Sequence, residues 1–213
     1  GLRSVTMRTV AFSVTGVDRS TMRSLMNAAR AALARPGEIA AATSRTGAPA
    51  AIARLVGATH EQIRAAVMTF PGVEHRIEFV RELNGVRYYN DSKATNVDAT
   101  LKAIAAFPGS LWIILGGKDK GSDYSPLRSA LQGKAHAALL IGATAAKIQS
   151  QLDGLNVLQC GTLETAIHEA HSRACSGDIV LLAPACASFD QFESYEHRGR
   201  EFKRMVANLG AAE

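Results

Sequence analysis

Short apolar runs alternate with longer amphipathic segments from residue 77 onward. The clearest run, Leu111-Trp112-Ile113-Ile114-Leu115, is continuously apolar, which is typical of a strand that is covered on both faces of a sheet. Strands that alternate with helices of about a dozen residues favour a mostly parallel sheet with helices packed on both sides. The alternation therefore predicts an α/β fold with a doubly wound, Rossmann-like sheet.

Turn signals set the limits of the expected elements. Asn84-Gly85 is a strong hairpin signal, so the strand that follows it is expected to return beside the strand that precedes it. Pro108-Gly109 ends the helix that comes next. Strands are expected at 77–83, 86–90, 111–115, 137–141, 156–159 and 178–182, and helices at 97–107, 144–152, 162–175 and 190–208.

The first 77 residues carry weaker signals than the rest. Alternation within 5–14 favours one or two strands, and alanine-rich composition favours helices at 18–35 and 49–56. A third helix is better marked, because Thr59 can cap it and Ile63 then lies on an apolar face. The sequence thus divides into a small, partly helical amino-terminal part, 1–77, and an α/β domain, 78–213.

Composition restricts the classes of partner. The net charge of +5 suits polyanionic small molecules or nucleic acid, but the basic residues are dispersed, and only four tyrosines and one tryptophan are present for base stacking. We therefore expect no nucleic acid partner. No apolar run approaches the roughly 20 residues that span a bilayer, so no membrane partner is expected. Three cysteines without a CxxC pair, and no apolar secretion signal at the start, favour a cytoplasmic setting.

Three polar loops follow expected strands and should meet at the carboxyl edge of the sheet, where α/β proteins bind ligands. They cover 90–96, 116–123 and 183–190. Lys93 lies where a new helix begins, and a cation there opposes the helix dipole unless an anion is bound. The residues alone therefore predict an anion site around Lys93. The side chains that the loops contribute are Asp91, Lys93, Thr95, Lys118, Lys120 and Ser188.

Several nucleotide and hydrolase motifs are absent from the sequence. G-x-x-x-x-G-K-[ST] does not occur, which excludes a P-loop of this chain's own, and the absence of G-x-G-x-x-G disfavours classical dinucleotide binding. Ser188 lacks a G-x-S-x-G elbow, and Cys186 is interpreted as a small packing residue rather than a nucleophile. His168 and His171 do not form H-E-x-x-H and are interpreted as a solvated surface pair.

Four segments of the sequence together resemble the Mur ligases. They are His75-Arg76, NDSKATN at 90–96, LGGKDKG at 115–121 and APACASFDQFESYEHRG at 183–199. The resemblance runs from about Val56 to Leu209 and is greatest to the family members that add D-glutamate. It implies the carboxyl-terminal domain of such a ligase with the tail of its central domain. The UDP-binding domain and the central P-loop of the same ligase are then the missing partners of this chain. The residues alone leave two interpretations of His75-Arg76 open, an interdomain contact and a phosphate clamp. The resemblance favours the phosphate clamp.

The resemblance implies an ATP-dependent, amide-forming ligase of peptidoglycan synthesis. In the full-length enzyme, which uses ATP and Mg²⁺, ATP phosphorylates the carboxylate of UDP-N-acetylmuramoyl-L-alanine, and the amine of D-glutamate then attacks the acyl phosphate. The implied D-glutamate-binding residues are Lys120, Thr95, Ser188, Phe189 and Tyr195, the last two through their backbones. The implied nucleotide-binding residues are Arg76, Asp91 and Lys93, of which Arg76 and Lys93 are also assigned to catalysis, and no metal ligand is assigned.

The sequence departs from the family pattern before the helix expected at 49–56. The family carries a His-Asn…Asn pattern there for nucleotide and metal, whereas 41–47 reads Ala-Ala-Thr-Ser-Arg-Thr-Gly, and 17–50 as a whole does not resemble the family. Because a P-loop is missing as well, the chain alone is expected to hold no cofactor and to be inactive. Two alternatives stay open, a stand-alone, non-catalytic binding module of Mur-ligase descent and a related ligase such as a folylpolyglutamate synthase.

Overall fold

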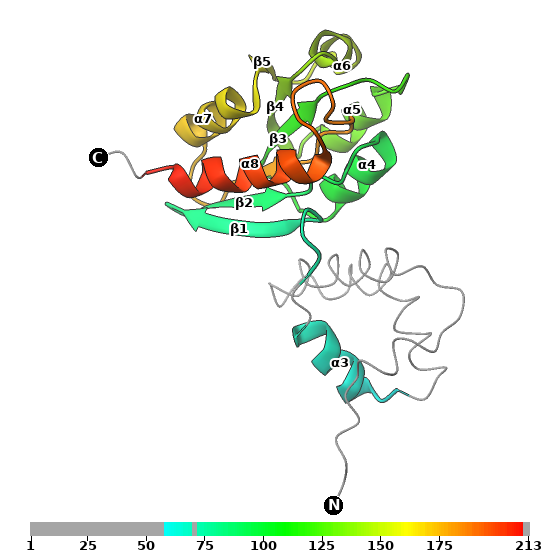
Figure 1. Cartoon of the computed structure of the whole chain (residues 1–213), viewed down its shortest axis with the longest axis vertical. Helices are drawn as coiled ribbons and strands as arrows, with labels where there is room; N and C mark the ends of the chain where they lie inside the picture. Colours follow the sequence, from blue (N-terminus) through cyan, green and yellow to red (C-terminus); the bar gives the residue numbers. More distant parts are fainter. Residues whose placement is uncertain (1–57, 70–71, 211–213) are drawn as a thin grey trace, which may run out of the picture. The chain divides into compact units, whose positions relative to one another are not determined.

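The computed structural model describes residues 58–69 and 72–210 (Figure 1). The chain divides into two compact units, Gly1–Val73 and Glu74–Glu213. The strands predicted within 5–14 and the helices predicted at 18–35 and 49–56 lie outside the described residues.

In the first unit the structure describes one helix, α3, which covers His60–Thr69. Its start is a reciprocal capping box: Thr59 Oγ1 accepts from the Gln62 amide at 3.2 Å, and Gln62 Oε1 accepts from the Thr59 amide at 2.9 Å. The predicted third helix is therefore present, with the predicted cap.

The second unit is built on one six-stranded sheet in the order β1-β2-β6-β3-β4-β5. β1 pairs antiparallel with β2 through the predicted hairpin, and the other four pairings are parallel. The prediction of a mostly parallel α/β sheet is confirmed. The strands are β1 (Glu78–Leu83), β2 (Val86–Asn90), β3 (Leu111–Gly116), β4 (Ala135–Ile141), β5 (Val157–Gly161) and β6 (Ile179–Leu182).

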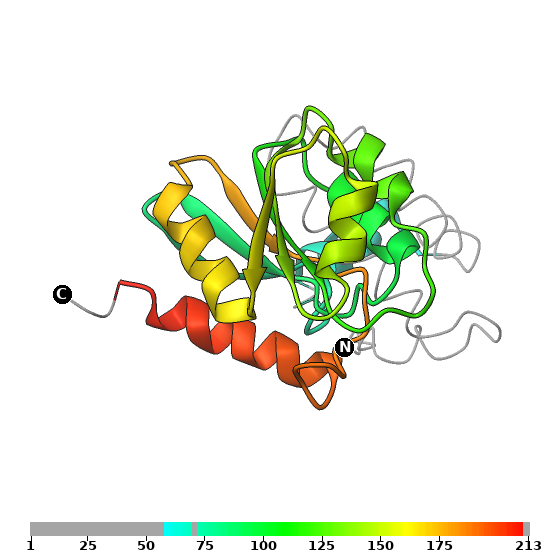
Figure 2. The ribbon, with the colours of Figure 1, turned by 90° about the horizontal axis from the view of Figure 1, so that it is seen from above.

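Helices cover both faces of this sheet, as Figure 2 shows from above. One face packs against α4, α5 and α6 through residues such as Ile104, Leu127 and Ile148, and the other packs against α7 and α8 through Ile167 and Phe202. None of the helices among the described residues combines the length and apolar character that crossing a membrane requires. The helices are α4 (Val97–Ala105), α5 (Ser125–Leu131), α6 (Ala145–Gln151), α7 (Leu163–Arg173) and α8 (Tyr195–Asn208).

Two helices differ from the prediction. The sequence analysis missed α5, which is only seven residues long and has Pro126 in its first turn. α8 begins at Tyr195 rather than near residue 190, because Ser194 is its N-cap and accepts from the His197 amide at 3.1 Å. The intervening residues are thereby left to the third polar loop.

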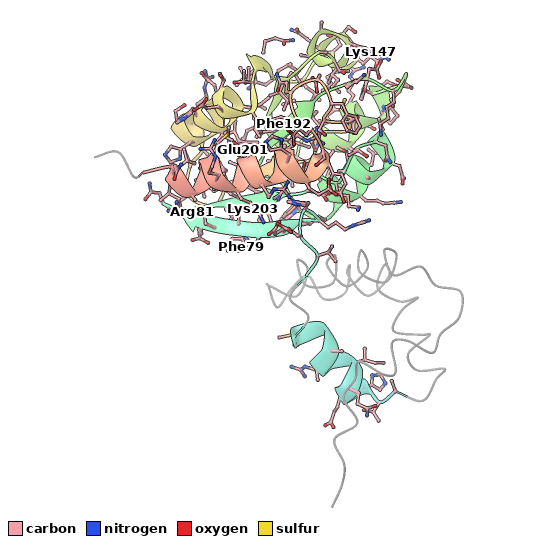
Figure 3. The ribbon with its side chains drawn as sticks, viewed as in Figure 1. Phe79, Arg81, Lys147, Phe192, Glu201 and Lys203 are labelled. Carbon is pink, nitrogen blue, oxygen red and sulfur yellow. The ribbon has the colours of Figure 1, made fainter. Side chains whose placement is uncertain are left out.

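The segment before β1 packs on the second unit. His75 is buried, and its Nδ1 lies 2.9 Å from Asn90 Nδ2 at the end of β2. Lys203 of α8 donates to Glu74 at 2.7 Å and to Glu78 at 3.0 Å. The side chains of Lys203 and Arg81 lie between α8 and β1 (Figure 3). The boundary between the two units therefore falls before Glu74, four residues earlier than the boundary placed before residue 78 from the sequence.

Candidate functional site

The three polar loops converge at the carboxyl edge of the parallel strands, as predicted. The amide of Ala185 in the third loop donates to Ala94 O in the first at 2.9 Å. The amide of Lys118 in the second loop donates to Ala187 O in the third, also at 2.9 Å. The third loop therefore lies between the other two, and Asn96 begins α4 by accepting from the Ala99 amide at 2.8 Å.

Arg198 of α8 ties two of these loops together, and the sequence analysis gave it no role. Its guanidinium is completely buried, donating from Nε to Ser92 Oγ at 3.0 Å and from Nη2 to Ser92 O at 3.0 Å and Cys186 O at 3.2 Å. Burial lowers its pKa to about 10, so it stays charged at neutral pH. Its burial could have been predicted from its spacing in the sequence. Arg198 precedes the buried Phe202 and Val206 by one and two helical turns, so the three residues share one face of α8.

Glycine is required where the second loop approaches its neighbours. Gly117 has φ of 138°, and a Cβ at this position would collide with Ala187 O. A Cβ on Gly116 would collide with Ile141 O in the same way. These two glycines let the backbone that leads to Lys120 lie directly against β4 and the third loop.

Four of the five residues assigned to D-glutamate lie on the three loops, and the fifth, Tyr195, begins α8. Lys120 is exposed, and its Nζ donates to Thr95 O at 3.3 Å. Ser188 is buried, and its Oγ has no hydrogen-bond partner within the described part of the chain. A buried hydroxyl without a partner is costly, and a ligand oxygen would relieve that cost. Phe189 is 65% exposed beside it.

The residues assigned to nucleotide gather around the first loop. Lys93 Nζ donates to Tyr195 Oη at 2.7 Å and lies 4.6 Å from the centre of the Tyr195 ring. Burial raises the pKa of Asp91 to about 7, while the Ile77 amide and the charge of Arg76 act in the opposite direction. The first loop thus presents a restrained ammonium beside a carboxyl group that titrates near neutral pH.

A family model described as "Mur ligase, glutamate ligase domain" matches residues 75–186. The chain belongs to this family. It is 61% identical over 163 residues to a UDP-N-acetylmuramoylalanine–D-glutamate ligase of Solibacter usitatus, covering 76% of this chain and 37% of that protein. It is 57% identical over 162 residues to the enzyme of the same name from Acidobacterium capsulatum, covering 75% and 35%. The chain spans a little over a third of the length of these relatives.

Solved structures show the same fold as this Mur ligase domain. The MurF ligase of Thermotoga maritima in complex with ADP superposes with a TM-score of 0.51 at 18% identity, covering 81% of this chain and 38% of that one. At this level of identity the similarity concerns the fold. The family match begins at His75, beside the boundary between the two units, and includes the first two polar loops.

Two further sequence interpretations can be checked in the Mur ligase domain. Cys186 is buried with its Sγ 3.1 Å from Tyr124 Oη, and burial raises the pKa of its thiol, which suits a packing residue. His171 is not simply a solvated partner of His168, because its Nδ1 lies 3.0 Å from the hydroxyl of the buried Tyr88.

Proposed function

We propose that this chain is the amino-acid-binding part of an ATP-dependent ligase that joins D-glutamate to UDP-N-acetylmuramoyl-L-alanine in cytoplasmic peptidoglycan synthesis. It corresponds to the carboxyl-terminal portion of that ligase, whose other domains are its partners. The names of the relatives that match about three quarters of the chain support this proposal. The observation that carries it is the junction of three loops, with Lys120 and the unpartnered Ser188 hydroxyl on two of them.

A dicarboxylic amino acid suits this junction. The exposed ammonium of Lys120 would pair with one carboxylate, and the hydroxyls of Ser188 and Thr95 would serve as neutral donors to oxygens that need several hydrogen bonds. A charge-assisted hydrogen bond contributes about 1.5–3 kcal/mol, so one lysine can dominate the affinity. The backbones near Phe189 and Tyr195 complete the proposed D-glutamate site.

The residues assigned to nucleotide account for part of a site for a phosphate-bearing ligand. Lys93 and Arg76 would hold phosphate oxygens, and the buried Asp91 carboxyl would accept a hydroxyl group. ATP supplies the phosphoryl group that activates the substrate carboxylate. Within residues 58–69 and 72–210 no three His, Cys, Asp or Glu side chains come together to hold a metal ion. Mg²⁺ at a nucleotide site is commonly held by one or two carboxylates with phosphate oxygens and water, and we propose that the other domains of the ligase help to hold it.

The test of this function is Lys120→Ala in a ligase that carries this domain. Residues 74–213 would replace the homologous segment of the Solibacter usitatus relative, and KM for D-glutamate and ATP would be measured separately. Loss of one charge-assisted contact should raise KM for D-glutamate by about 10- to 150-fold. The melting temperature should change little, because the side chain is exposed.

Lys118→Ala is the matched control, because Lys118 is an exposed lysine of the same loop. Its effect on KM should be much smaller. An unchanged KM for D-glutamate and an unchanged kcat in Lys120→Ala would remove Lys120 from the site, and a change confined to ATP would move it to the nucleotide side. A folded hybrid that binds no D-glutamate would contradict the proposed function itself.

A further inference from the structure

Asp119 is the centre of a hydrogen-bond network in the second polar loop. One carboxylate oxygen, Oδ1, accepts from the backbone amides of Gly121 at 3.0 Å and Ser122 at 3.2 Å. The same oxygen accepts from Tyr124 Oη at 2.8 Å, and the other, Oδ2, accepts from Lys147 Nζ at 2.8 Å. These four hydrogen bonds hold the Asp119 carboxylate in one position within the turn.

The turn that Asp119 closes is the turn that carries Lys120. Lys120 lies between Asp119 and Gly121, whose amide donates back to the Asp119 carboxylate, so the side chain of one residue sets the backbone of the next. Lys120 then extends to Thr95 O in the first loop. The position of the Lys120 ammonium therefore depends on the position of the Asp119 carboxylate.

Helix α6 supplies the fixed end of this network. Lys147 projects from α6 (Figure 3), and Gln151, one turn further along, accepts from the Tyr124 amide at 2.8 Å. Tyr124 is completely buried, and its hydroxyl lies 3.1 Å from Cys186 Sγ in the third loop. The network thus fixes the Lys120 turn to α6 and to the third loop.

The charge of Asp119 would otherwise be unfavourable at this place. A carboxylate one residue from Lys120 repels an acidic ligand that Lys120 attracts. The ammonium of Lys147, together with the Tyr124 hydroxyl, holds the pKa of Asp119 well below its usual range, so the carboxylate is charged at neutral pH, and a counter-charge beside it reduces the repulsion. Lys147 is that counter-charge, with its side chain 39% exposed and that of Asp119 33% exposed.

We propose that Asp119 is a positioning residue for Lys120 and that Lys147 holds the Asp119 carboxylate and neutralises its charge beside the site for an acidic amino acid. The identity of the ligand rests on the proposed function. The geometry of the turn does not depend on which ligand binds. An experiment can therefore contradict the positioning role of Asp119 without contradicting the proposed function, and the reverse.

The experiment uses the 213-residue chain and two NMR measurements: the solvent exchange of the Gly121 and Ser122 amides, and the shifts of these amides on titration with D-glutamate. Lys147→Met should accelerate exchange and weaken the D-glutamate response, each by about twofold to fivefold, the range expected for loss of a partly exposed ion pair. Lys147→Arg should restore both. Lys102→Met is the matched control, because it breaks an exposed lysine–aspartate pair on α4 and should change neither.

Asp119 variants separate its two roles. Asp119→Ala should accelerate exchange most, because both amides lose their acceptor, whereas Asp119→Asn keeps an acceptor oxygen and should preserve much of the protection. With Asp119→Asn in place, Lys147→Met should have little further effect on D-glutamate, because no charge remains to be neutralised.

The proposal is overturned if Asp119→Ala and Lys147→Met leave exchange at Gly121 and Ser122 unchanged. It is also overturned if Lys147→Met weakens the D-glutamate response equally with and without Asp119→Asn. A wild-type chain that gives no response to D-glutamate, or one in which Lys120→Ala changes nothing, would count against the proposed function and leave the exchange result to decide the positioning role.

Discussion

The ionisable side chain of Asp91 is almost completely shielded from solvent. The residue is 8% exposed, and burial raises the pKa of its carboxyl to about 7. Between about pH 4 and pH 7 the folded protein therefore holds a proton that the unfolded chain has released. A raised pKa of this kind favours the folded state most below that window, and the contribution is lost as the pH rises through 7.

Asp91→Asn should remove this pH dependence. In the wild-type chain, Asp91 should lower the free energy of unfolding by up to about 1.4 kcal/mol for each pH unit across the window. The variant should therefore give a flatter profile of unfolding free energy between about pH 4 and 7, measured by urea denaturation. Asp98→Asn, which changes an exposed carboxylate on α4, should keep the wild-type slope. Equal slopes for wild type and Asp91→Asn would show that Asp91 does not titrate in this range.

At the same scale, the lysines of the polar loops are easier to single out from the sequence than the residues that hold these loops in place. Lys93 is singled out as a cation at the start of a helix and Lys120 by the family resemblance, and both lie in loops of the junction. Arg198 and Asp119 act through the burial and the partners that folding gives them. A charged residue usually lies in solvent, so neither stands out before its surroundings are known.

Among the elements, the short segment before β1 behaves as part of the α/β unit. His75 is buried against Asn90 and Gly199, and Glu74 and Glu78 share Lys203 of α8. His75 and Ile77 both have positive φ angles, 63° and 43°, which non-glycine residues adopt only where the surroundings hold them. The contacts on α8 and β2 supply that restraint.

A chain of residues 72–213 should therefore be more stable than a chain of residues 79–213. Loss of the buried His75 contact and of the Lys203 ion pairs should lower the free energy of unfolding by about 2–4 kcal/mol in urea. Lys203→Met in the longer chain isolates the ion pairs and should cost less than about 1 kcal/mol. If the two chains were equally stable, the segment would not belong to the unit.

Element prediction succeeded where the local pattern and the tertiary packing agree. β3 is apolar throughout and buried throughout, and the Asn84-Gly85 turn joins β1 to β2 as expected. α5 was missed because its seven residues place only Leu127 and Leu131 in the core, too few to mark a helical period. The start of α8 was placed about five residues too early, because Ser194 rather than a residue near 190 is its N-cap.

For the whole molecule, the sequence motifs limit what the chain can do alone. Its sequence contains no P-loop, the motif that commonly cradles the phosphates of ATP, and we therefore predict that the chain is inactive alone. The purified 213-residue chain should release no phosphate from ATP in the presence of both UDP-N-acetylmuramoyl-L-alanine and D-glutamate. The full-length Solibacter usitatus relative, assayed in parallel, is the control. Phosphate release that requires both substrates would contradict this prediction.

The strand order has a consequence for synthesis of the protein on the ribosome. β6 is the last strand in the sequence, yet it lies between β2 and β3 and is the only link between them in the described sheet. Until residue 182 has left the exit tunnel, the nascent chain can form only the β1–β2 hairpin and the separate β3–β4–β5 layer, each with an unpaired edge that can join another chain. Because β6 and the loop after it bring Ala94 and Lys118 to the same place, the loop junction can assemble only after β6 and this loop have left the ribosome.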